Sequence, residues 1–539
     1  MKKQHISFGF AESGNQTLAI KNARIVVGDG NVIENGTVII KGNRIKKVTQ
    51  EQADVEVSKV IDAKGMTLMP GLIDTHVHFF VIVGKGEEAF REQIKKMAPH
   101  YLQKYLRHGV TTVRSMTDPL DLILEFKEMV NNGEIQGPRI LAVGPSFTAP
   151  DGHPASTIGK TDPYCRATAT IEVDIEEEAK QEVLRLKDKG VDAIKVVLDG
   201  FYNGEAIPKL SNNLLLAIVD EAHKNNLKVF AHTHMEEDVR DAINAGVDGI
   251  EHGVCGEAIT DNSLADLLKQ KEIVFTPTLW IMNQNLDSES MSKAKYAKQN
   301  LKYLSDRNIK LAFGTDAPAL LGAGTAEIKE MEYLAEAGLS PEKIIQIATK
   351  NSADSLGLLD QIGTVEAGKV ADLILVDGDP LHDITTMQNI QIVIKSGKVV
   401  YDQEMAEEST QSVQPNPVSW FEIPVLDMSR AVGFYEYVFG INLKQESFGP
   451  VEMAYFPADP DAPGATGMLI KIPGEPRELS GKTGGVIIYF STKDIDATIQ
   501  RIKGKGGKVH ATPFTLDGKS YKAIVEDTEG NVFGIQTVD

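Results

Sequence analysis

The feature that most limits the fold of this chain is a regular alternation of short apolar runs and longer amphipathic segments between residues 71 and 355. Such alternation predicts parallel β/α architecture, with strands in the apolar runs and helices between them. The predicted strands lie around residues 71–76, 110–114, 139–143, 192–197, 227–232, 249–252, 273–277 and 310–315. Eight strands over this length fit an α/β fold of the (β/α)8 class, the TIM barrel, which usually takes about 250 residues.

Two β-rich segments flank this region. Residues 18–67 and 363–401 both alternate short β-branched runs with Gly and Asn turns, the pattern of small antiparallel strands. Because the first segment is too short for a complete sandwich, we expect the two flanks to pair. The predicted organisation is a composite β-sandwich domain over 1–70 and 356–402 around a barrel over 71–355.

A further unit follows the second flank. Residues 403–416 are acidic and rich in Gln and Ser without an apolar period, which predicts a linker. Residues 417–539 carry strands of their own and amphipathic helices near 428–438 and 494–505, which predict a small α+β domain. A chain of 539 residues is long enough for several domains, each with its own core.

Composition limits the partners. Lys and Arg total 56 against 76 Asp and Glu, a formal charge of −20, which argues against a nucleic-acid or anionic-membrane partner. The two cysteines, Cys165 and Cys255, are too few for a disulfide framework or a Cys-based zinc site, and we expect free thiols. No run approaches the roughly 18 apolar residues of a membrane span, and the N-terminus lacks the apolar segment of a secretory signal. We expect a cytoplasmic protein, or a secreted one if a signal segment was removed.

Polar residues gather at the ends of the predicted barrel strands. They are His76, His78, Lys195, His232, His252 and Asp316. Barrel enzymes carry their chemistry at the C-terminal strand ends, so we expect these residues from five strands to converge. A single histidine at a strand end is more often structural. Together, several imidazoles and a carboxylate are what a borderline divalent cation such as zinc prefers.

Residues 18–402 resemble the amidohydrolase superfamily, in particular its imidazolonepropionase-like and prolidase-like branch. The resemblance rests on segments in family order: Pro-Gly-Leu-Ile-Asp-Thr-His-Val-His, Asp-Ala-Ile-Lys-Val, Val-Phe-Ala-His, Ile-Glu-His-Gly, Gly-Thr-Asp-Ala and Gly-Thr-Val-Glu-Ala-Gly-Lys-Val-Ala-Asp-Leu. It implies a site for two divalent metal ions, which we expect to be zinc. His76, His78 and Asp316 would bind the first metal, and His232 and His252 the second.

The same resemblance implies that Lys195 is carboxylated on its amine by CO2 and bridges both metals. An unpaired ammonium in the apolar strand Ala-Ile-Lys-Val-Val would be costly, and an anionic carbamate beside two cations removes that cost. A lysine that extends to the surface along its aliphatic stem is the alternative, which its apolar neighbours disfavour.

The implied activity is hydrolysis of a C–N amide bond in a small molecule, with an N-acyl amino acid, a dipeptide or a cyclic amide as substrate. Water activated by the two metals would attack the carbonyl, and Asp316 would be the catalytic acid and base that passes a proton to the leaving nitrogen. A mononuclear cyclic-amide hydrolase of the imidazolonepropionase kind, or a deaminase, stays open. In either of these, Lys195 is not carboxylated.

Three further residues are predicted substrate contacts. His153 matches a Gly-His segment that lines the pocket in relatives. His234 points to the same side as His232 in a strand of period two, so it contacts substrate or faces the rim. Tyr202 is a candidate for binding a carboxylate. Where relatives often read Thr-Val-Arg-Asp, this chain reads Thr112-Val-Arg-Ser-Met, so no role tied to that aspartate is expected.

Residues 418–539 resemble the glyoxalase/bleomycin-resistance (vicinal oxygen chelate) fold. The resemblance rests on Trp420-Phe-Glu-Ile-Pro-Val-Leu-Asp-Met-Ser-Arg-Ala-Val-Gly-Phe-Tyr-Glu-Tyr-Val-Phe-Gly, Asp494-Ile-Asp-Ala-Thr and Glu526-Asp-Thr-Glu-Gly-Asn-Val-Phe-Gly. The positions of this family's metal ligands hold Trp420 and Gly534, so the resemblance implies a small-molecule-binding or scaffold module, with a homo-oligomer formed through it. A binding or resistance protein that acts through this unit, with an inactive barrel, is the alternative of another class. The intact ligand set of the barrel disfavours it.

Overall fold

The computed structural model describes most of the chain. The described residues are 17–50, 57–79, 87–160, 163–202, 205–284, 288–405, 418–425, 427–439, 441–448, 451–457, 465–471, 487–514, 521–526 and 532–537. They belong to two compact units, Met1–Glu404 and Met405–Asp539. The predicted linker over 403–416 lies outside the described residues apart from 403–405.

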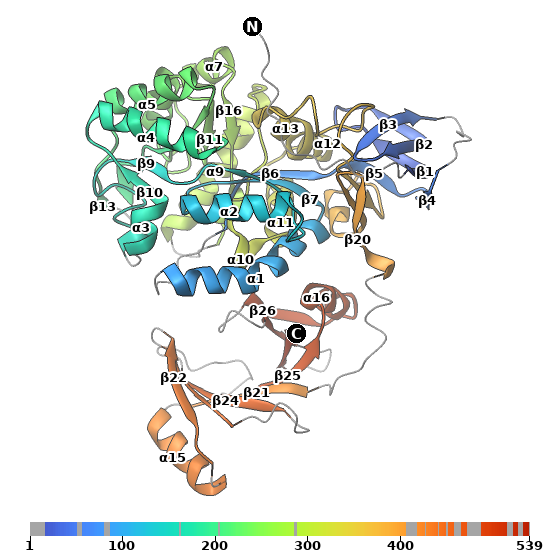
Figure 1. Ribbon diagram of the computed structural model, residues 1–539, viewed down its shortest axis with the longest axis vertical. Helices are drawn as coiled ribbons and strands as arrows, with labels where there is room; N and C mark the ends of the chain where they lie inside the picture. Colours follow the sequence, from blue (N-terminus) through green and yellow to red (C-terminus); the bar gives the residue numbers. More distant parts are fainter. Residues whose placement is uncertain are drawn as a thin grey trace. The chain divides into compact units, whose positions relative to one another are not determined.

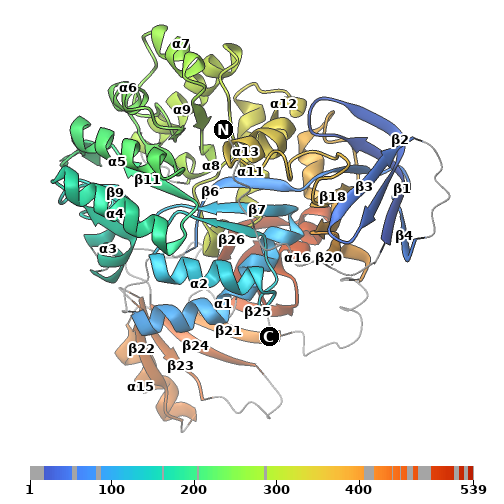
Figure 2. The same cartoon turned by 45° about the horizontal axis from the view of Figure 1, so that its top comes forward.

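Strands from both flanks of the first unit share one sheet. The N-terminal flank supplies β1 (Thr17–Val26), β2 (Val32–Lys41), β3 (Arg44–Thr49), β4 (Lys59–Asp62) and β5 (Thr67–Pro70), and the C-terminal flank supplies β18 (Leu373–Val376), β19 (Ile390–Lys395) and β20 (Lys398–Asp402). Their order is β20-β19-β18-β5-β1-β2-β3, with β4 beside β1. The antiparallel pair of β18 with β5, in which Leu373 faces Pro70, joins the two flanks. Figure 1 and Figure 2 show the blue and orange strands side by side.

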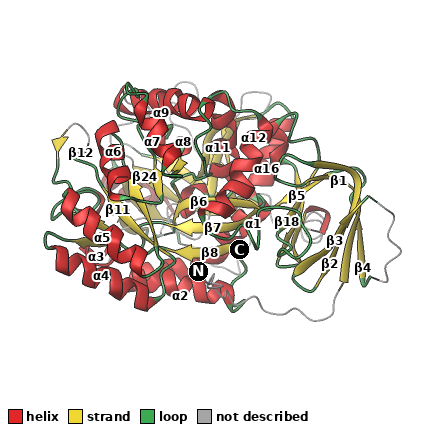
Figure 3. Cartoon of the chain, turned by 90° about the horizontal axis from the view of Figure 1, so that it is seen from above, coloured by secondary structure: helices red, strands yellow, loops and turns green. Residues whose placement is uncertain are grey.

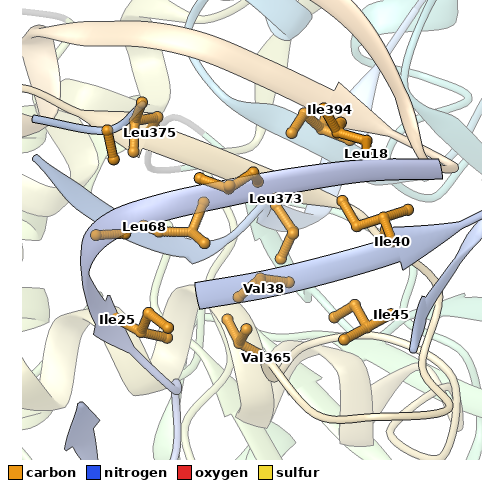
Figure 4. Close-up of a cluster of buried hydrophobic side chains, with 14 of the residues drawn as sticks. Leu18, Ile25, Val38, Ile40, Ile45, Leu68, Val365, Leu373, Leu375 and Ile394 are labelled. Atoms are coloured by element: carbon orange, nitrogen blue, oxygen red, sulfur yellow. The ribbon is translucent and has the colours of Figure 1, made fainter. Parts of the chain in front are cut away.

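The core of this sheet consists of aliphatic side chains. Its buried members include Leu18, Ile25, Val38, Ile40, Ile45, Leu68, Val365, Leu373, Leu375 and Ile394 (Figure 4). Branched side chains pack well on a pleated surface, and each one fully buried contributes about 1.5–3 kcal/mol. Because residues of both flanks pack in this core, the core holds the two ends of the barrel segment, residues 71–355, close to one another.

Parallel strands and helices alternate between the flanks. The strands are β6 (Leu72–His78), β7 (Val110–Ser115), β8 (Arg139–Ala142), β9 (Ser146–Thr148), β10 (Thr170–Glu172), β11 (Ala193–Val197), β14 (Lys228–His232), β15 (Gly249–Glu251), β16 (Val274–Thr276) and β17 (Ala317–Pro318), with a hairpin of β12 (Phe201–Tyr202) and β13 (Glu205–Ala206) after β11. They pair in the orders β17-β6-β7-β8 and β10-β9-β11-β14-β15-β16. Asp192 N donates to Ala142 O at 2.8 Å, and Phe275 pairs with Leu311, so both gaps between these sheets are bridged. The α/β barrel predicted from the alternation is confirmed.

One of the predicted strands is irregular. The prediction of a regular strand over 310–315 was wrong, although backbone bonds to Phe275 and Thr75 still hold this segment between β16 and β6. The segment ends at Asp316, whose φ of 57° is in the left-handed region that strands avoid. The predicted strand over 139–143 is found as β8, and a further short strand, β9, follows Gly144, where φ is 77°.

Helices surround the barrel strands, as Figure 3 shows in red around yellow. They are α1 (Glu87–Arg107), α2 (Leu120–Asn131), α3 (Pro163–Ala169), α4 (Glu176–Lys189), α5 (Asn212–Lys224), α6 (Glu236–Ala245), α7 (Ser263–Gln270), α8 (Leu279–Met282), α9 (Ser288–Asp306), α10 (Ala319–Gly322), α11 (Thr325–Glu336), α12 (Pro341–Gln346) and α13 (Ser352–Ser355). Helix α5 is typical: Ser211 caps it by accepting from Leu214 N, and it buries Leu214, Ile218 and Ala222 at helical spacing. Among the helices of the described residues, none is long and apolar enough to cross a membrane.

The second unit is a curved sheet with two helices along its described residues. Its strands are β21 (Val418–Pro424), β22 (Lys444–Phe448), β23 (Val451–Tyr455), β24 (Thr466–Lys471), β25 (Ile487–Thr492), β26 (Lys508–Phe514), β27 (Lys522–Glu526) and β28 (Val532–Thr537), in the order β22-β23-β24-β21-β25-β28-β27-β26. The helices are α15 (Met428–Phe439) and α16 (Ile495–Gly504). On β21, Ile423 packs toward α15, whereas Trp420 packs against Met468 and Ile470 of β24.

Candidate metal centre

Two histidines of β6 and an aspartate from the last barrel segment form one half of the site. His76 and His78 are two residues apart on β6, so their rings share a face. Asp316 Oδ1 lies 2.7 Å from His78 Nε2 and 3.2 Å from His76 Nε2. Three potential ligand atoms therefore meet at the C-terminal end of β6.

The backbone around Asp316 is fixed by its contacts with β6. Asp316 N donates to His76 O at 2.8 Å. The buried carboxylate of Asp74 accepts from His76 N at 2.9 Å and from the Thr315 hydroxyl at 2.7 Å. A β-carbon on Gly314 would lie 2.9 Å from His76 Cβ, so only glycine permits this approach of the two segments. These contacts explain how an irregular segment places Asp316 accurately.

The other half of the site is a histidine group around Asp199, which follows β11. Asp199 Oδ2 lies 2.8 Å from His232 Nε2 and 2.8 Å from His234 Nδ1. His252, just after β15, connects the halves, because its ring centroid is 4.4 Å from that of His232 and 4.8 Å from that of His76. The predicted strand-end residues thus line one continuous site.

Three of the candidate ligand rings each have one nitrogen within hydrogen-bond distance of a protein oxygen. The contacts are His76 Nδ1 to Glu251 Oε2 at 2.7 Å, His252 Nδ1 to Thr278 Oγ1 at 2.8 Å and His232 Nε2 to Asp199 Oδ2 at 2.8 Å. Such a contact fixes the orientation and tautomer of the ring and leaves the second nitrogen for a metal. Within the described part of the chain, the buried second nitrogen of His252, Nε2, has no hydrogen-bond partner.

These atoms fit divalent cations. In each of two groups the potential ligand atoms lie within 4.8 Å of one another: His76, His252 and Asp316, and Asp199, His232 and His234. Imidazole nitrogen and carboxylate oxygen are the donors that zinc prefers, and a buried nitrogen without a partner is what such a cation would satisfy. The second group differs from the predicted second-metal pair, because His232 is grouped with Asp199 and His234 instead of His252.

Burial and neighbouring charges set the protonation of these residues. Burial lowers the pKa of His252 well below its ordinary value, and the nearby His232 adds to the effect. Burial also lowers the pKa of His232 to about 4, against the opposing charge of Asp199. Burial would raise the pKa of Asp316, but His76 and His252 hold it well below its usual range. Neutral imidazole and ionised carboxylate are the forms that bind a metal.

Lys195 lies on β11 with its side chain inside the barrel, where it is 1 % exposed. Burial lowers the pKa of Lys195 to about 8, although Glu251 and Asp316 oppose this. Glu251 also accepts from Arg114 Nη2 at 2.6 Å, and the Arg114 guanidinium lies 3.6 Å from the ring centroid of Phe230. Lys195 therefore belongs to a buried set of charged side chains and does not reach the surface.

The predicted substrate contacts lie beside the Asp199 group. The His153 ring stacks on Tyr202 with centroids 5.2 Å apart and lies 5.1 Å from the His232 ring. Tyr202 is 36 % exposed on the β12–β13 hairpin. Burial would lower the pKa of His234, but Asp199 raises it well above its ordinary value. Contact of these residues with a substrate stays a prediction.

Sequence reasoning missed Asp199, Glu251, Arg114 and Thr278. Asp199 is four residues after Lys195, so the strand period already placed both on one face. Glu251 and Arg114 are charges inside apolar strands, and the argument applied to Lys195 would have singled them out. Thr278 carried no such signal, because its contact with His252 depends on tertiary structure.

Comparison with known protein families agrees with this division of the chain. The profile of the Amidohydrolase family matches residues 67–400. The profile of the Glyoxalase/Bleomycin resistance protein/Dioxygenase superfamily matches residues 418–535. The metal centre lies entirely within the first of these matches.

Individual relatives cover the first unit. An ochratoxinase of Aspergillus niger is 27 % identical over 423 residues, a match that spans 70 % of this chain and 85 % of the relative. An imidazolonepropionase of Geobacillus kaustophilus is 23 % identical over 418 residues, spanning 70 % of this chain and 91 % of the relative. Among solved structures, a Xaa-Pro dipeptidase with methionine bound in its active site has a TM-score of 0.64 at 28 % identity, over 72 % of this chain and 100 % of that chain.

Proposed function

Since this chain belongs to the amidohydrolase family and is a hydrolytic enzyme acting on carbon–nitrogen bonds, we propose that it cleaves an amide bond with the help of two divalent cations. The substrate is a small molecule: an N-acyl amino acid, a dipeptide or a cyclic amide. The observation that carries the proposal is the convergence of His76 Nε2 and His78 Nε2 on a single oxygen of Asp316. Beside them, the buried Nε2 of His252 has no hydrogen-bond partner among the described residues.

The first cation, proposed to be Zn²⁺, would be held by His76, His78 and Asp316. The second would be held by His232 and His252, with Lys195 between the two. Such cations, when bound, lower the pKa of water and polarise a carbonyl group. The surrounding protein keeps the donors in the form that binds them, since burial holds the pKa of both second-site histidines low.

Lys195 would join the cations as a carbamate. In its formation the neutral amine nitrogen bonds to the carbon of CO2, one C=O π pair becomes the carboxylate charge, and the nitrogen releases a proton to water. The full burial of the side chain supports this, because an ammonium there lacks water while an anion would face two cations. The nearby Glu251 carboxylate is paired with the Arg114 guanidinium. Its negative charge is thereby compensated and does not repel a carbamate on Lys195.

Asp316 would move the proton during hydrolysis. Its carboxylate is ionised at neutral pH, because His76 and His252 hold its pKa well below the usual range. Oδ1 faces the two histidines of β6 that would hold the first cation, so Oδ2 would be the oxygen that accepts a proton from the attacking water. The same oxygen then returns the proton to the departing nitrogen, a transfer that contributes about 100-fold or more to the rate.

An acidic substrate is supported by the groups at the edge of the site. The raised pKa of His234 makes its ring a cation that suits a substrate carboxylate, and Tyr202 and His153 offer a stacked polar wall beside it. The Xaa-Pro dipeptidase of similar fold holds methionine, an amino acid, in its active site. We therefore place N-acyl amino acids and dipeptides before cyclic amides as substrates.

The second unit is proposed to act without a metal, as a small-molecule-binding or scaffold module. The two family positions for ligands do not fit a cation. At Gly534 a β-carbon would lie 2.2 Å from the Tyr489 ring, so no ligating side chain has room. At Trp420 the indole offers no metal-binding lone pair. Assembly of the chain into a homo-oligomer, and the absence of nucleic-acid and membrane partners, remain predictions of the sequence.

The deciding experiment is the metal content per chain of the full-length protein, measured by mass spectrometry of the element. We expect about two equivalents in the wild type and about one in Lys195→Ala. Lys395→Ala is the matched control, because Lys395, on β19 of the flanking sheet, is partly buried and donates to Gly137 O at 2.6 Å, away from the site. A metal-free protein with full activity would contradict the proposal.

The same variants separate the proposal from its nearest alternative. The imidazolonepropionase relative makes a mononuclear cyclic-amide hydrolase the second candidate. That candidate predicts one equivalent of metal in both wild type and Lys195→Ala, and turnover of lactams but not of N-acyl amino acids or dipeptides. Two equivalents together with turnover of the acyclic amides would exclude it.

A further inference from the structure

We propose that Asp199 is a positioning residue of the barrel site, which holds the His232 ring so that its Nδ1 atom faces the second cation. The proposal rests on the two-cation function stated above and names the residue that organises its second half. No family motif quoted for the barrel includes Asp199, and its role follows from its contacts alone.

The geometry centres on one carboxylate oxygen. Asp199 is 3 % exposed, and its Oδ2 atom lies 2.8 Å from both His232 Nε2 and His234 Nδ1. An ionised carboxylate only accepts hydrogen bonds, so both ring nitrogens must carry their protons. With its proton on Nε2, a neutral His232 has its lone pair on Nδ1. Asp199 thereby selects the nitrogen that His232 offers to a cation.

The other two anchored rings show the same arrangement. Glu251 accepts from His76 Nδ1 at 2.7 Å, and Thr278 Oγ1 lies 2.8 Å from His252 Nδ1. In each case one nitrogen is engaged by the protein, which leaves the opposite one for a cation. Asp199 completes this set for His232, and carboxylate partners of this kind raise ligand basicity and affinity for metal.

Direct binding of a cation by Asp199 is the competing interpretation. It would use His232 Nε2 as a ligand, because Nε2 is the nitrogen beside Asp199. It would use the buried Asp199 Oδ1, which has no hydrogen-bond partner among the described residues, and would leave His252 to the group of His76 and Asp316. The positioning role instead pairs Nδ1 of His232 with the unpartnered Nε2 of His252 on two adjacent rings, whose centroids are 4.4 Å apart.

The test is titration of metal-free full-length protein with Zn²⁺ by calorimetry. We compare wild type with Asp199→Asn and Asp199→Ala. Asn keeps an oxygen that can accept from His232, while Ala removes it. We expect Ala to weaken the second equivalent about 10- to 100-fold with the first unchanged, and Asn to fall between Ala and wild type.

Asp192→Asn is the matched control. Asp192 is a largely buried carboxylate at the other end of β11, where it accepts from Lys127 Nζ and Ala142 N, both at 2.6 Å. Its substitution should leave both zinc affinities at wild-type values. Near-UV circular dichroism of every variant checks that the fold is retained.

Each outcome has one meaning. An unchanged second affinity in Asp199→Ala would overturn the positioning role alone, whereas fewer than two equivalents in wild type would overturn the proposed two-cation function. A crystal structure of the zinc-loaded wild type gives the second readout. An Asp199 oxygen at the bonding distance of about 2.0–2.2 Å from zinc would show a ligand and overturn the proposal.

Discussion

The two units of this chain both bury ionised groups within a β-sheet, but they satisfy them differently. In the second unit, the Glu422 carboxylate accepts from Lys522 Nζ at 2.6 Å and from the Tyr489 hydroxyl at 2.9 Å, so both of its oxygens are used. In the barrel, Asp199 Oδ1 and His252 Nε2 are buried and have no hydrogen-bond partner among the described residues.

This difference indicates which cluster is built for a ligand. A buried polar atom without a partner costs about 1–3 kcal/mol, so a chain retains several only where something else completes them. The opposite charges of Glu422 and Lys522 compensate each other, and the Lys522 ammonium also lies 4.6 Å from the Trp420 ring centroid. Trp420 Nε1 beside this pair is also buried without a hydrogen-bond partner among the described residues, but the charged atoms of the pair are partnered. We therefore interpret the barrel cluster as functional and the second as structural.

The largest expected effect is that of Asp316→Asn in the barrel. The amide keeps the size of the side chain but loses the negative charge and the ability to accept a proton, so kcat should fall about 1,000-fold or more. The measurement is steady-state hydrolysis of the best substrate among N-acyl amino acids, dipeptides and lactams.

Asp248→Asn is the control for that variant. Asp248 precedes β15 at the opposite strand end from His252 and accepts from Val229 N at 2.8 Å. Residues at the N-terminal ends of barrel strands contribute to stability and not to chemistry. We expect near wild-type kcat with a lower melting temperature, and equal loss of activity in the two variants would contradict the assignment of Asp316.

The next effect belongs to the second unit. Lys522→Met leaves the Glu422 carboxylate buried without its cation, which should lower the free energy of unfolding of this unit by about 3–5 kcal/mol. Adding Glu422→Gln removes the stranded charge and should restore most of the loss. Trp420, which packs beside the pair, reports unfolding by fluorescence in a Trp280→Phe background.

Hydrolytic activity should not change in either variant, because every residue of the metal centre belongs to the first unit. A loss of kcat to the level of Asp316→Asn would show that the pair of Glu422 and Lys522 is not merely structural. An unfolding free energy equal to that of wild type would show that the ion pair contributes nothing to the fold.

A third effect tests whether the partners of the ligand histidines matter in the first half of the site. Glu251→Gln keeps an oxygen near His76 Nδ1 but loses the charge that also binds Arg114. We expect the affinity for the first cation to fall about 10- to 100-fold. Thr278→Val, which removes the neutral partner of His252, should weaken only the second cation and by less. Both are measured by the zinc titration used for Asp199.

The sequence predicts the positions of the ligands better than the positions of their partners. His76, His78, His232 and His252 stand at the ends of apolar strands, and the strand period alone brings them to one end of a barrel. The residues that orient these histidines come from elsewhere in the fold. Thr278, which contacts His252, follows a different strand, and no sequence pattern predicts its φ of 47°.

The irregular conformation of the last barrel segment, residues 310–316, could also not be predicted from a sequence pattern. Its apolar residues Leu311, Ala312 and Phe313 predict a strand, but the path is set by the contacts of Asp74 with Thr315 and by the room that Gly314 leaves for His76. Periodicity detects which residues are buried, whereas such local conformation depends on side-chain contacts across the barrel.

The smallest expected effect is a pH dependence of the unfolding free energy, caused by Glu330, which contacts the chain just after Thr278. Glu330 of α11 accepts from the backbone N–H groups of Leu279 and Trp280, which begin α8. Burial raises the pKa of Glu330 to about 8, although these two hydrogen bonds oppose the rise. The folded chain thus holds a proton that the unfolded chain releases above about pH 4.5.

The sign follows from linkage. The contribution of Glu330 to stability is fully present below about pH 4.5 and is lost as the pH rises to about 8, because only the folded state then binds the proton. The unfolding free energy of wild type should therefore fall between pH 5 and pH 8 relative to Glu330→Gln, by on the order of 1–3 kcal/mol. Trp280 fluorescence in a Trp420→Phe background measures it on the full-length chain.

Glu366→Gln provides the comparison of opposite sign. Hydrogen bonds from Thr364 and Lys369 lower the pKa of Glu366, so it titrates below this window and its substitution should not change the slope between pH 5 and pH 8. If Glu330→Gln has the same slope as wild type, Glu330 is ionised in the folded chain across this range. The loop that holds Thr278 against His252 would then be fixed by a charged carboxylate at the start of α8, and its contribution would no longer vary with pH.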